Sequence, residues 1–202
     1  MLLQTGAEVS HVIGSIVDPD KLMRQVVELI RERFDLYYVG LFLVDQTLRL
    51  HSQPGEWAYL RAATGEAGET MLKHGHRLRA GSDSMVGQCI IEGKPRIALD
   101  AGKATLRFAN PLLPETRSEL ALPLISRGEA IGALSIQSTE ESAFSKEDIA
   151  ALEIMAGQIA NSIENARLYK ETEAALEELK AVHSRYIRGA WDRYLGGRDR
   201  ES

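Results

Sequence analysis

The segment that decides the fold class is residues 118–138, because it contains two adjoining strand-like stretches. They read Ser118-Glu-Leu-Ala-Leu-Pro-Leu-Ile-Ser126 and Ala130-Ile-Gly-Ala-Leu-Ser-Ile-Gln-Ser138, joined by Arg127-Gly-Glu129. In the first stretch, leucines at positions 120, 122 and 124 alternate with alanine, proline and isoleucine. Successive side chains of a strand point to opposite faces, so neither face of this strand is expected to be solvated. The sheet that contains it needs a further layer on each side.

Further strands and helices are expected upstream. Residues 37–44 are aromatic and β-branched and predict a strand that is covered on both faces. Asp18 is expected to cap one helix and Gly93 to end another. The full set comprises strands at 48–52, 57–63, 76–79 and 95–100, helices at 4–15, 19–34, 66–74 and 84–92, and a long loop at 101–117.

The last element is a long helix whose apolar stripe changes direction. Ser145-Lys-Glu-Asp148 fits a capping box at its start. A first stripe, Leu152, Ala156, Ile159, Ile163 and Ala166, is expected to pack on the sheet. Beyond it, a heptad-like spacing predicts a dimer interface: Leu168, Thr172, Ala175, Leu179, Val182 and Tyr186. A parallel coiled coil is the preferred interpretation, and packing back onto the same domain is the alternative.

Together these patterns predict an α+β fold with a central antiparallel sheet. The helices at 19–34 and 145–167 would cover one face of the sheet. A cap of loops and short helices from residues 81–117 would cover the other face, and the long C-terminal helix would complete the chain.

Composition excludes several classes of protein. The 202 residues carry 24 Lys and Arg against 29 Asp and Glu, and this excess of acid argues against a nonspecific nucleic-acid binder. No run approaches the roughly 18 apolar residues of a membrane span, so no membrane insertion is expected. The start of the chain has no secretory-signal pattern. One cysteine allows no internal disulfide, and a cytoplasmic location is expected.

No catalytic constellation is visible in the sequence. It has no glycine-rich phosphate loop, no His-Glu-x-x-His and no nucleophile elbow. The pair His74 and His76 lacks a third ligand for a metal, so an exposed turn is expected there. Cys89 has no evident base partner, and His183 is read as a solvated helix position. We therefore expect no metal, and we expect that the protein is not an enzyme.

Three stretches resemble a bacterial GAF domain of the kind found in sensor histidine kinases. They are Met85-Val-Gly-Gln-Cys-Ile-Ile-Glu-Gly-Lys-Pro-Arg-Ile-Ala-Leu-Asp100, Thr116-Arg-Ser-Glu-Leu-Ala-Leu-Pro-Leu124, and Ile131-Gly-Ala-Leu-Ser-Ile-Gln-Ser138 with Ala143-Phe-Ser-Lys-Glu-Asp148 and Ile163-Glu-Asn-Ala-Arg-Leu-Tyr169. The resemblance covers roughly residues 20–172. It divides the chain into an N-terminal helix (1–18), a GAF-like sensor domain (19–167), a coiled-coil-type signalling helix (168–195) and a disordered tail (196–202).

The resemblance implies a sensory module that binds a small molecule between the sheet and its cap. Such domains usually dimerise through terminal helices and pass a signal to a downstream output domain or kinase. The chain would then be a piece of a larger receptor or a partner of separate proteins. Candidate ligand-binding residues follow from position in the family pattern: Asp100, Arg107, Phe108, Arg117, Ser118 and Glu119. An ion pair of Arg117 with Asp100, and a loop anchor formed by Arg107 and Phe108, are the structural alternatives.

Departures from the family narrow the choice of ligand, and no cofactor is identified. The Asn-Lys pair of cyclic-nucleotide-binding relatives is missing, and Cys89 is the only possible attachment point for a bilin. Free methionine sulfoxide reductases share this fold but use several cysteines. A ligand-free dimerisation and spacer domain, with its pocket filled by Leu106, Phe108, Leu112 and Leu113, is the main alternative function. A redox sensor using Cys89 is a further one.

Overall fold

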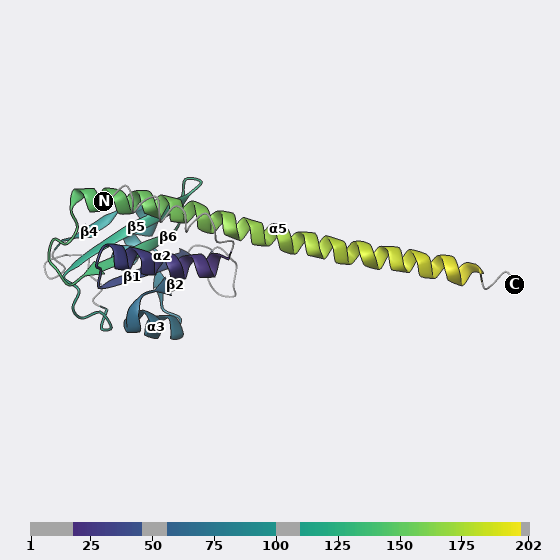
Figure 1. The fold of residues 1–202 in the computed structure, drawn as a ribbon, viewed down its shortest axis with the longest axis horizontal. Helices are drawn as coiled ribbons and strands as arrows, with labels where there is room; N and C mark the ends of the chain where they lie inside the picture. Colours follow the sequence, from purple (N-terminus) through teal and green to yellow (C-terminus); the bar gives the residue numbers. More distant parts are fainter. Residues whose placement is uncertain (1–17, 46–55, 100–109, 199–202) are drawn as a thin grey trace. The chain divides into compact units, whose positions relative to one another are not determined.

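Six antiparallel strands form one sheet in the computed structural model, which describes residues 18–45, 56–99 and 110–198 (Figure 1). The sheet order is β3-β2-β1-β6-β5-β4, and every neighbouring pair is antiparallel. The predicted α+β class is therefore confirmed. The strands are β1 (Tyr38–Val44), β2 (Trp57–Ala63), β3 (Arg77–Arg79), β4 (Arg96–Ala98), β5 (Ser118–Ser126) and β6 (Glu129–Ser138).

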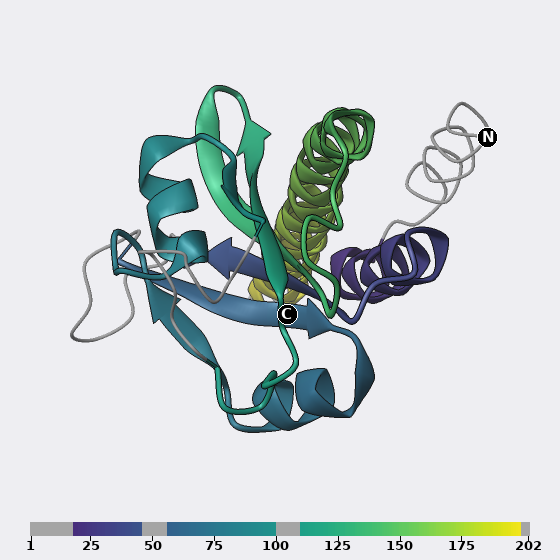
Figure 2. The ribbon, with the colours of Figure 1, turned by 90° about the vertical axis from the view of Figure 1, so that its left-hand side faces the viewer.

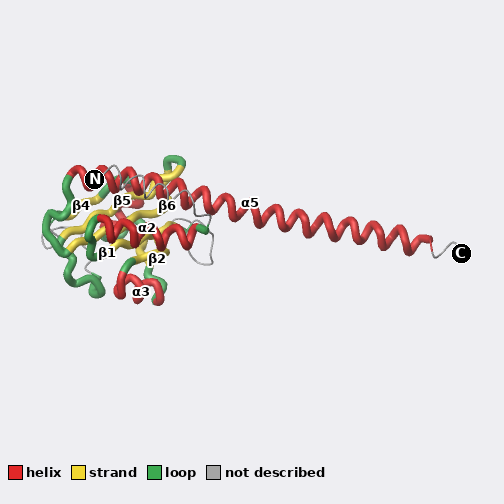
Figure 3. Tube along the Cα trace, in the orientation of Figure 1, coloured by secondary structure: helices red, strands yellow, loops and turns green. Residues whose placement is uncertain are grey.

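Two helices cover one face of the sheet, as predicted. Figure 2 shows α2 (Pro19–Arg33) and the first part of α5 (Lys146–Arg198) on the same side of the strands, and Figure 3 shows α2 lying over them. Their apolar faces and the inward side chains of the central strands form one buried core. It includes Leu22, Met23, Val26, Val27, Ile30, Leu120, Leu122, Leu124, Leu134, Ile136, Leu152 and Ile159.

Short helices cover the opposite face. They are α3 (Gly65–Lys73) and α4 (Met85–Glu92), and Figure 2 shows α4 across the sheet from α2 and α5. The hydroxyl of Ser84 caps α4 by accepting from the Gly87 amide at 2.9 Å. Gly93 ends α4 with φ at 61°, a left-handed conformation that glycine adopts without strain. This second core contains Phe42, Met71, Met85, Val86, Cys89, Ala121 and Ala133.

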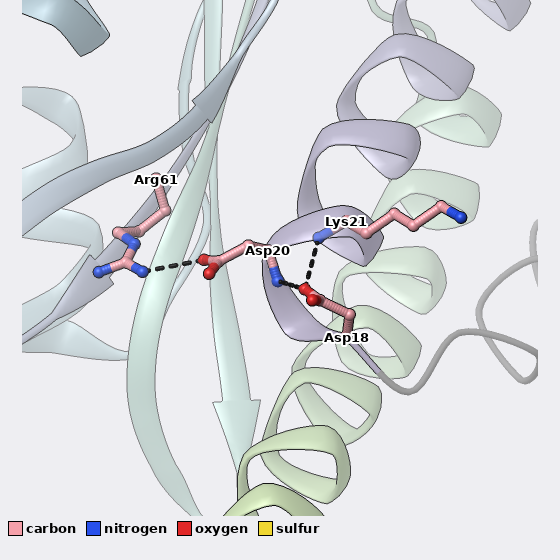
Figure 4. A network of polar contacts seen from close by, with 4 residues as sticks. All are labelled: Asp18, Asp20, Lys21 and Arg61. Atoms are coloured by element: carbon pink, nitrogen blue, oxygen red, sulfur yellow. Dashed lines mark hydrogen bonds and ion pairs between the residues drawn. The ribbon is translucent and has the colours of Figure 1, made fainter.

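The start of α2 is fixed by a cap and by an ion pair to the sheet (Figure 4). The carboxylate of Asp18 accepts from the amides of Asp20 and Lys21 at 2.9 and 3.0 Å. Asp20 in turn receives a hydrogen bond at 2.9 Å from Arg61 of β2. The predicted Asp18 cap is confirmed, and the adjoining ion pair connects the helix start to a strand far along the chain.

Helix α5 begins with the predicted capping box. Ser145 and Asp148 exchange backbone-to-side-chain hydrogen bonds, each at 3.1 Å. The helix contains 53 residues, and the boundary between two compact units of the chain lies within it, after Glu164. In the second unit, the described side chains of residues 171–181 and 183–187 are all exposed.

Some boundaries differ from the sequence-based expectations. Helix α5 runs to Arg198, so residues 196–198, assigned to a disordered tail, are helical. No proline interrupts this stretch, and helix ends are the least determined part of a sequence pattern. The helix expected at 4–15, the strand expected at 48–52 and residues 101–109 of the expected loop lie outside the described residues. Within the described ranges, no helix is both long and apolar enough to cross a membrane.

Two glycines provide a test of how tightly the sheet is packed. A Cβ atom added at Gly132 in β6 would lie 2.0 Å from the carbonyl oxygen of Phe42, whereas one added at Gly157 in α5 would meet nothing within 4 Å. We expect Gly132→Ala to lower the free energy of unfolding by about 3 kcal/mol through overpacking. Gly157→Ala should raise it by about 1 kcal/mol, since alanine favours helix. Urea unfolding followed by circular dichroism measures both, and equal midpoints for the two variants would contradict this account.

Candidate functional site

A small cavity lies between the sheet and its cap. Its volume is about 40 Å³. One part of its wall is apolar and comes from the cap and from β1 and β3: Phe42, Met71, Leu78, Met85 and Val86. The other part is polar: Tyr38, His76, Ser84, Asn110, Glu119, Ser135 and Gln137. The cavity thus offers an apolar surface opposite a set of hydrogen-bonding groups.

Strand register brings the main polar groups into one row. Gln137 of β6 is paired with Tyr38 of β1 on one side and with Glu119 of β5 on the other. Paired residues of neighbouring strands point to the same face, so these three side chains lie side by side under the cap. Ser135 is two residues before Gln137 on the same face and is paired with Gly40. Residues that are distant in sequence therefore form one polar row.

Gly40 provides the space that this row needs. A Cβ atom added there would lie 2.3 Å from the phenolic oxygen of Tyr38 and would collide with its ring. The ring of Tyr38 therefore lies over the glycine backbone, and its phenol extends along the face of the sheet toward the row that holds Ser135. A side chain at position 40 would displace this phenol from its position in the wall.

A hydrogen-bond network fixes the orientation of Gln137. The hydroxyl of Thr116 donates to Gln137 Oε1 at 2.6 Å, and Gln137 Nε2 donates to Ser135 Oγ at 3.3 Å. All three residues are buried. Asn110 Nδ2 donates to the sulfur of Met71 at 3.0 Å at the edge of the cavity. Buried polar groups with partners hold fixed positions, so this part of the wall is pre-organised.

Burial is the main influence on the titratable groups of the wall. Burial raises the pKa of the Tyr38 phenol far above its usual value, and the negative charge of Glu119 raises it further. Burial lowers the pKa of His76, whose ring meets Phe42 edge-on at 6.0 Å between centroids. Tyr38 and His76 are therefore neutral at pH 7. Among the lining residues that the structure describes, Glu119 carries the one formal charge.

The predicted ligand-binding residues have different locations. Glu119 lines the cavity, whereas Ser118 is buried on the other side of β5 and donates to the Glu140 carbonyl at 2.7 Å. The expected division of these two residues between opposite faces is confirmed. Arg117 is exposed and forms an ion pair with Glu141 at 3.1 Å, away from the lining residues. Asp100, Arg107 and Phe108 lie outside the described residues, so a ligand role for them stays a prediction.

Sequence reasoning missed Tyr38, His76, Ser135 and Gln137 as wall residues. His74 is exposed, as expected of a turn, but His76 is half-buried and lines the cavity. The sequence of β6 did contain a pattern that indicates two of them. Ser135 and Gln137 alternate with leucine and isoleucine in a strand with no solvated face, so they have to be buried polar residues. No group of three or more potential metal-binding side chains occurs within the described part of the chain.

Cys89 does not belong to the cavity wall. It is fully buried in α4 and packs in the core of the cap. Burial raises the pKa of its thiol to about 12, and nearby Glu92 and Arg96 act in opposite directions. The thiol is therefore protonated at neutral pH.

Comparison with known proteins places the chain in a fold family. A family model described as "GAF domain" matches residues 17–164. The GAF domain of a phosphoenolpyruvate-protein phosphotransferase from Coxiella burnetii is similar, with a TM-score of 0.73, 23% identity, and coverage of 84% of this chain and 96% of that one. A putative GAF sensor protein from Burkholderia vietnamiensis gives a TM-score of 0.67 at 16% identity, covering 82% and 96%. No curated protein matches the sequence.

One comparison corrects the expectation that the protein is not an enzyme. A free methionine-R-sulfoxide reductase from Neisseria meningitidis, solved in complex with its substrate, has a TM-score of 0.70 at 20% identity, covering 84% of this chain and 92% of that one. Further such reductases are among the similar structures. The expectation was wrong because it treated the missing sequence motifs as decisive, whereas this fold carries enzymes. The family model and the shared fold agree on the family, and the chain belongs to the GAF domain family.

Proposed function

We propose that this GAF domain is a small-molecule sensor of a bacterial signal-transduction protein, of the kind found in sensor histidine kinases. The observation that carries the proposal is the cavity between sheet and cap, with a pre-organised polar row opposite an apolar wall. Small-molecule sites typically combine apolar lining with a few placed polar groups. The partners in this proposal are a small ligand, a second copy of the chain, and an output domain or kinase in the cytoplasm.

Strand β6 offers a route from the cavity to the long helix. Ser135 and Gln137 face the cavity, while Leu134 and Ile136 belong to the core that also contains Leu152 of α5. A ligand that binds one arrangement of the wall more tightly will therefore shift the packing of β6 against α5. In a dimer, such a shift would change how the two α5 helices meet.

A ligand-free dimerisation and spacer role is the second candidate, and the small cavity favours it. Pockets for drug-sized ligands measure about 300–1,000 Å³, well above the roughly 40 Å³ described here. Tyr38, Asn110 and Met71 form part of its wall, and the last two contact each other there. Of the expected filling residues, Leu113 is buried and Leu112 is exposed, while Leu106 and Phe108 lie outside the described residues.

Native mass spectrometry of the freshly purified chain distinguishes the two roles. We expect a retained mass above that of the protein, and its loss in Val86→Phe, because the larger ring would enter the cavity. Ile91→Phe is the matched control, since Ile91 is on the same helix but is 64% exposed. A bare protein mass in wild type, unchanged by incubation with bacterial small-molecule extract, would support the spacer role instead.

The exposed stripe of the distal helix supports association between two copies. In one chain Leu179 is 67% exposed and Tyr186 is 69% exposed, and both belong to the predicted heptad positions. Tyr169, Leu176 and Ile187 are exposed beside them. Elsewhere on the helix, Arg167 pairs with Glu171, and Lys180 pairs with Glu177. A helix with an apolar stripe next to a charged surface has the pattern of a bundle or coiled-coil strand.

Leu179→Glu tests this interface. Burying one leucine contributes about 1.5–3 kcal/mol, so two symmetric copies should weaken a dimer by about 3 kcal/mol or more. Analytical ultracentrifugation should show a dimer for wild type and for the control Glu173→Gln, and a folded monomer for Leu179→Glu. A monomeric wild type, or unfolding of the Leu179→Glu chain, would contradict the proposed interface.

A redox role for Cys89 has its own test in thiol reactivity. Burial raises the pKa of Cys89 to about 12, so the reactive thiolate is scarce in the folded chain at pH 8. An aromatic disulfide reagent should therefore react at least a hundredfold faster with the urea-unfolded chain than with the folded chain. Because the pKa of this thiol is higher in the folded chain than in the unfolded chain, the thiol stabilises the fold at pH values below its unfolded pKa. This contribution to the free energy of unfolding falls as the pH rises toward 12. Stoichiometric reaction of the folded chain within seconds would favour the redox sensor.

A further inference from the structure

The exposed side chains of the distal part of α5 indicate which face of this helix meets a second copy of the chain. Two columns of residues recur at intervals of seven: the Leu176 column, which is Tyr169, Leu176 and His183, and the shared column, which is Thr172, Leu179 and Tyr186. We propose that two α5 helices pack in parallel along these two columns and enclose His183 between them. This inference rests on the proposed dimer, because it specifies the interface of that dimer and adds a way to regulate it.

The amount of exposed apolar surface favours the Leu176 column. The sequence pattern instead paired the shared column with Leu168, Ala175 and Val182, here called the Ala175 column. In a single chain Tyr169 is 58% exposed and Leu176 is 51% exposed. Leu168 is already half-buried, and the side chain of Ala175 is a single methyl group. Because stabilisation grows with the apolar area removed from water, packing along the Leu176 column gains more.

The charges on the helix suit an identical partner. While His183 is neutral, the six residues of the two columns carry no formal charge, so two copies meet there without like-charge repulsion. Two ion pairs outside these columns are formed within one chain, Arg167 with Glu171 and Lys180 with Glu177. Both columns keep the same interval of seven residues, so two parallel helices remain in register along the interface.

His183 is the residue of this interface that can change its charge between pH 5 and 8. The Leu176 column occupies the a positions of the heptad, so each His183 would face the partner's His183. Residues 179–187 add Lys180, Arg185 and the phenol of Tyr186 to the surroundings, but they contain no acidic residue. Enclosing an unpaired positive charge is costly, so protonation of the two imidazoles opposes association. Acidification would therefore loosen the dimer.

Cysteine cross-linking distinguishes the two columns. Leu176→Cys and Ala175→Cys alter adjacent residues, and the native Cys89 is fully buried, so each folded variant has one accessible thiol. In a parallel pair of helices, facing a positions lie close together. Under mild oxidation at a concentration where both variants are dimeric, we expect Leu176→Cys to form the covalent dimer at least about tenfold faster. Equal rates, or faster reaction of Ala175→Cys, would overturn the proposed interface.

The pH dependence of association tests the enclosure of His183. Analytical ultracentrifugation should show a dissociation constant at least about tenfold higher at about pH 5.5 than at about pH 8, because the imidazoles become charged in this range. His183→Asn should remove most of this change, since asparagine is accepted at an a position and stays uncharged. His74→Asn is the matched control, because His74 is exposed and belongs to the other compact unit. An unchanged pH response in a folded His183→Asn chain would overturn the inference.

The failure of this inference is distinguishable from the failure of the proposed dimer. A wild-type chain that is monomeric at about pH 8 would overturn both. A dimer that cross-links through Ala175→Cys at least as fast as through Leu176→Cys would overturn the choice of column and leave the dimer standing. A dimer whose dissociation constant is the same at both pH values would overturn the enclosure of His183.

Discussion

The structure depends on one constraint, the burial of strand β6 on both of its faces. Its side chains alternate between two different environments, so each residue has to suit the layer that it faces. Leu134 and Ile136 pack among the helices, while Ser135 and Gln137 face the cavity on the opposite side. Gly132, in the same strand, leaves no room even for a methyl group beside the carbonyl of Phe42. A strand held this closely cannot shift on one face without a response on the other.

This arrangement links the candidate site to the long helix by direct packing. No separate pathway is required, because the strand that carries Gln137 also presents Ile136 to the core that contains the start of α5. The capping box at Ser145 and Asp148 fixes where that helix begins, and Ser145 lies seven residues after β6 ends at Ser138. In the proposed sensor, a displacement of the strand would therefore reach a helix whose start is defined.

Local patterns in the sequence predicted the elements well, but they could not predict the site. Caps depend on residues close together in sequence, so Asp18, Ser145 and Gly93 were correctly assigned. The alternation in β5 likewise separated Ser118 from Glu119. The polar row instead depends on the register of three strands, and register between distant strands is not encoded in any local period. Tyr38 was read as part of an apolar strand for this reason, and the half-buried position of His76 was missed.

The fold alone does not separate sensing from catalysis, since GAF sensors and methionine sulfoxide reductases both adopt it. Function has to be argued from the groups in the cavity. The one cysteine of this chain is turned into the core of the cap, with a thiol pKa of about 12, and it is not a lining residue. Any chemistry or recognition performed by the described wall therefore depends on its other polar side chains, of which Ser135 and Gln137 are held in a buried hydrogen-bond network. Strand register and that network place these groups before any ligand arrives, so recognition at this wall would start from a pre-organised surface.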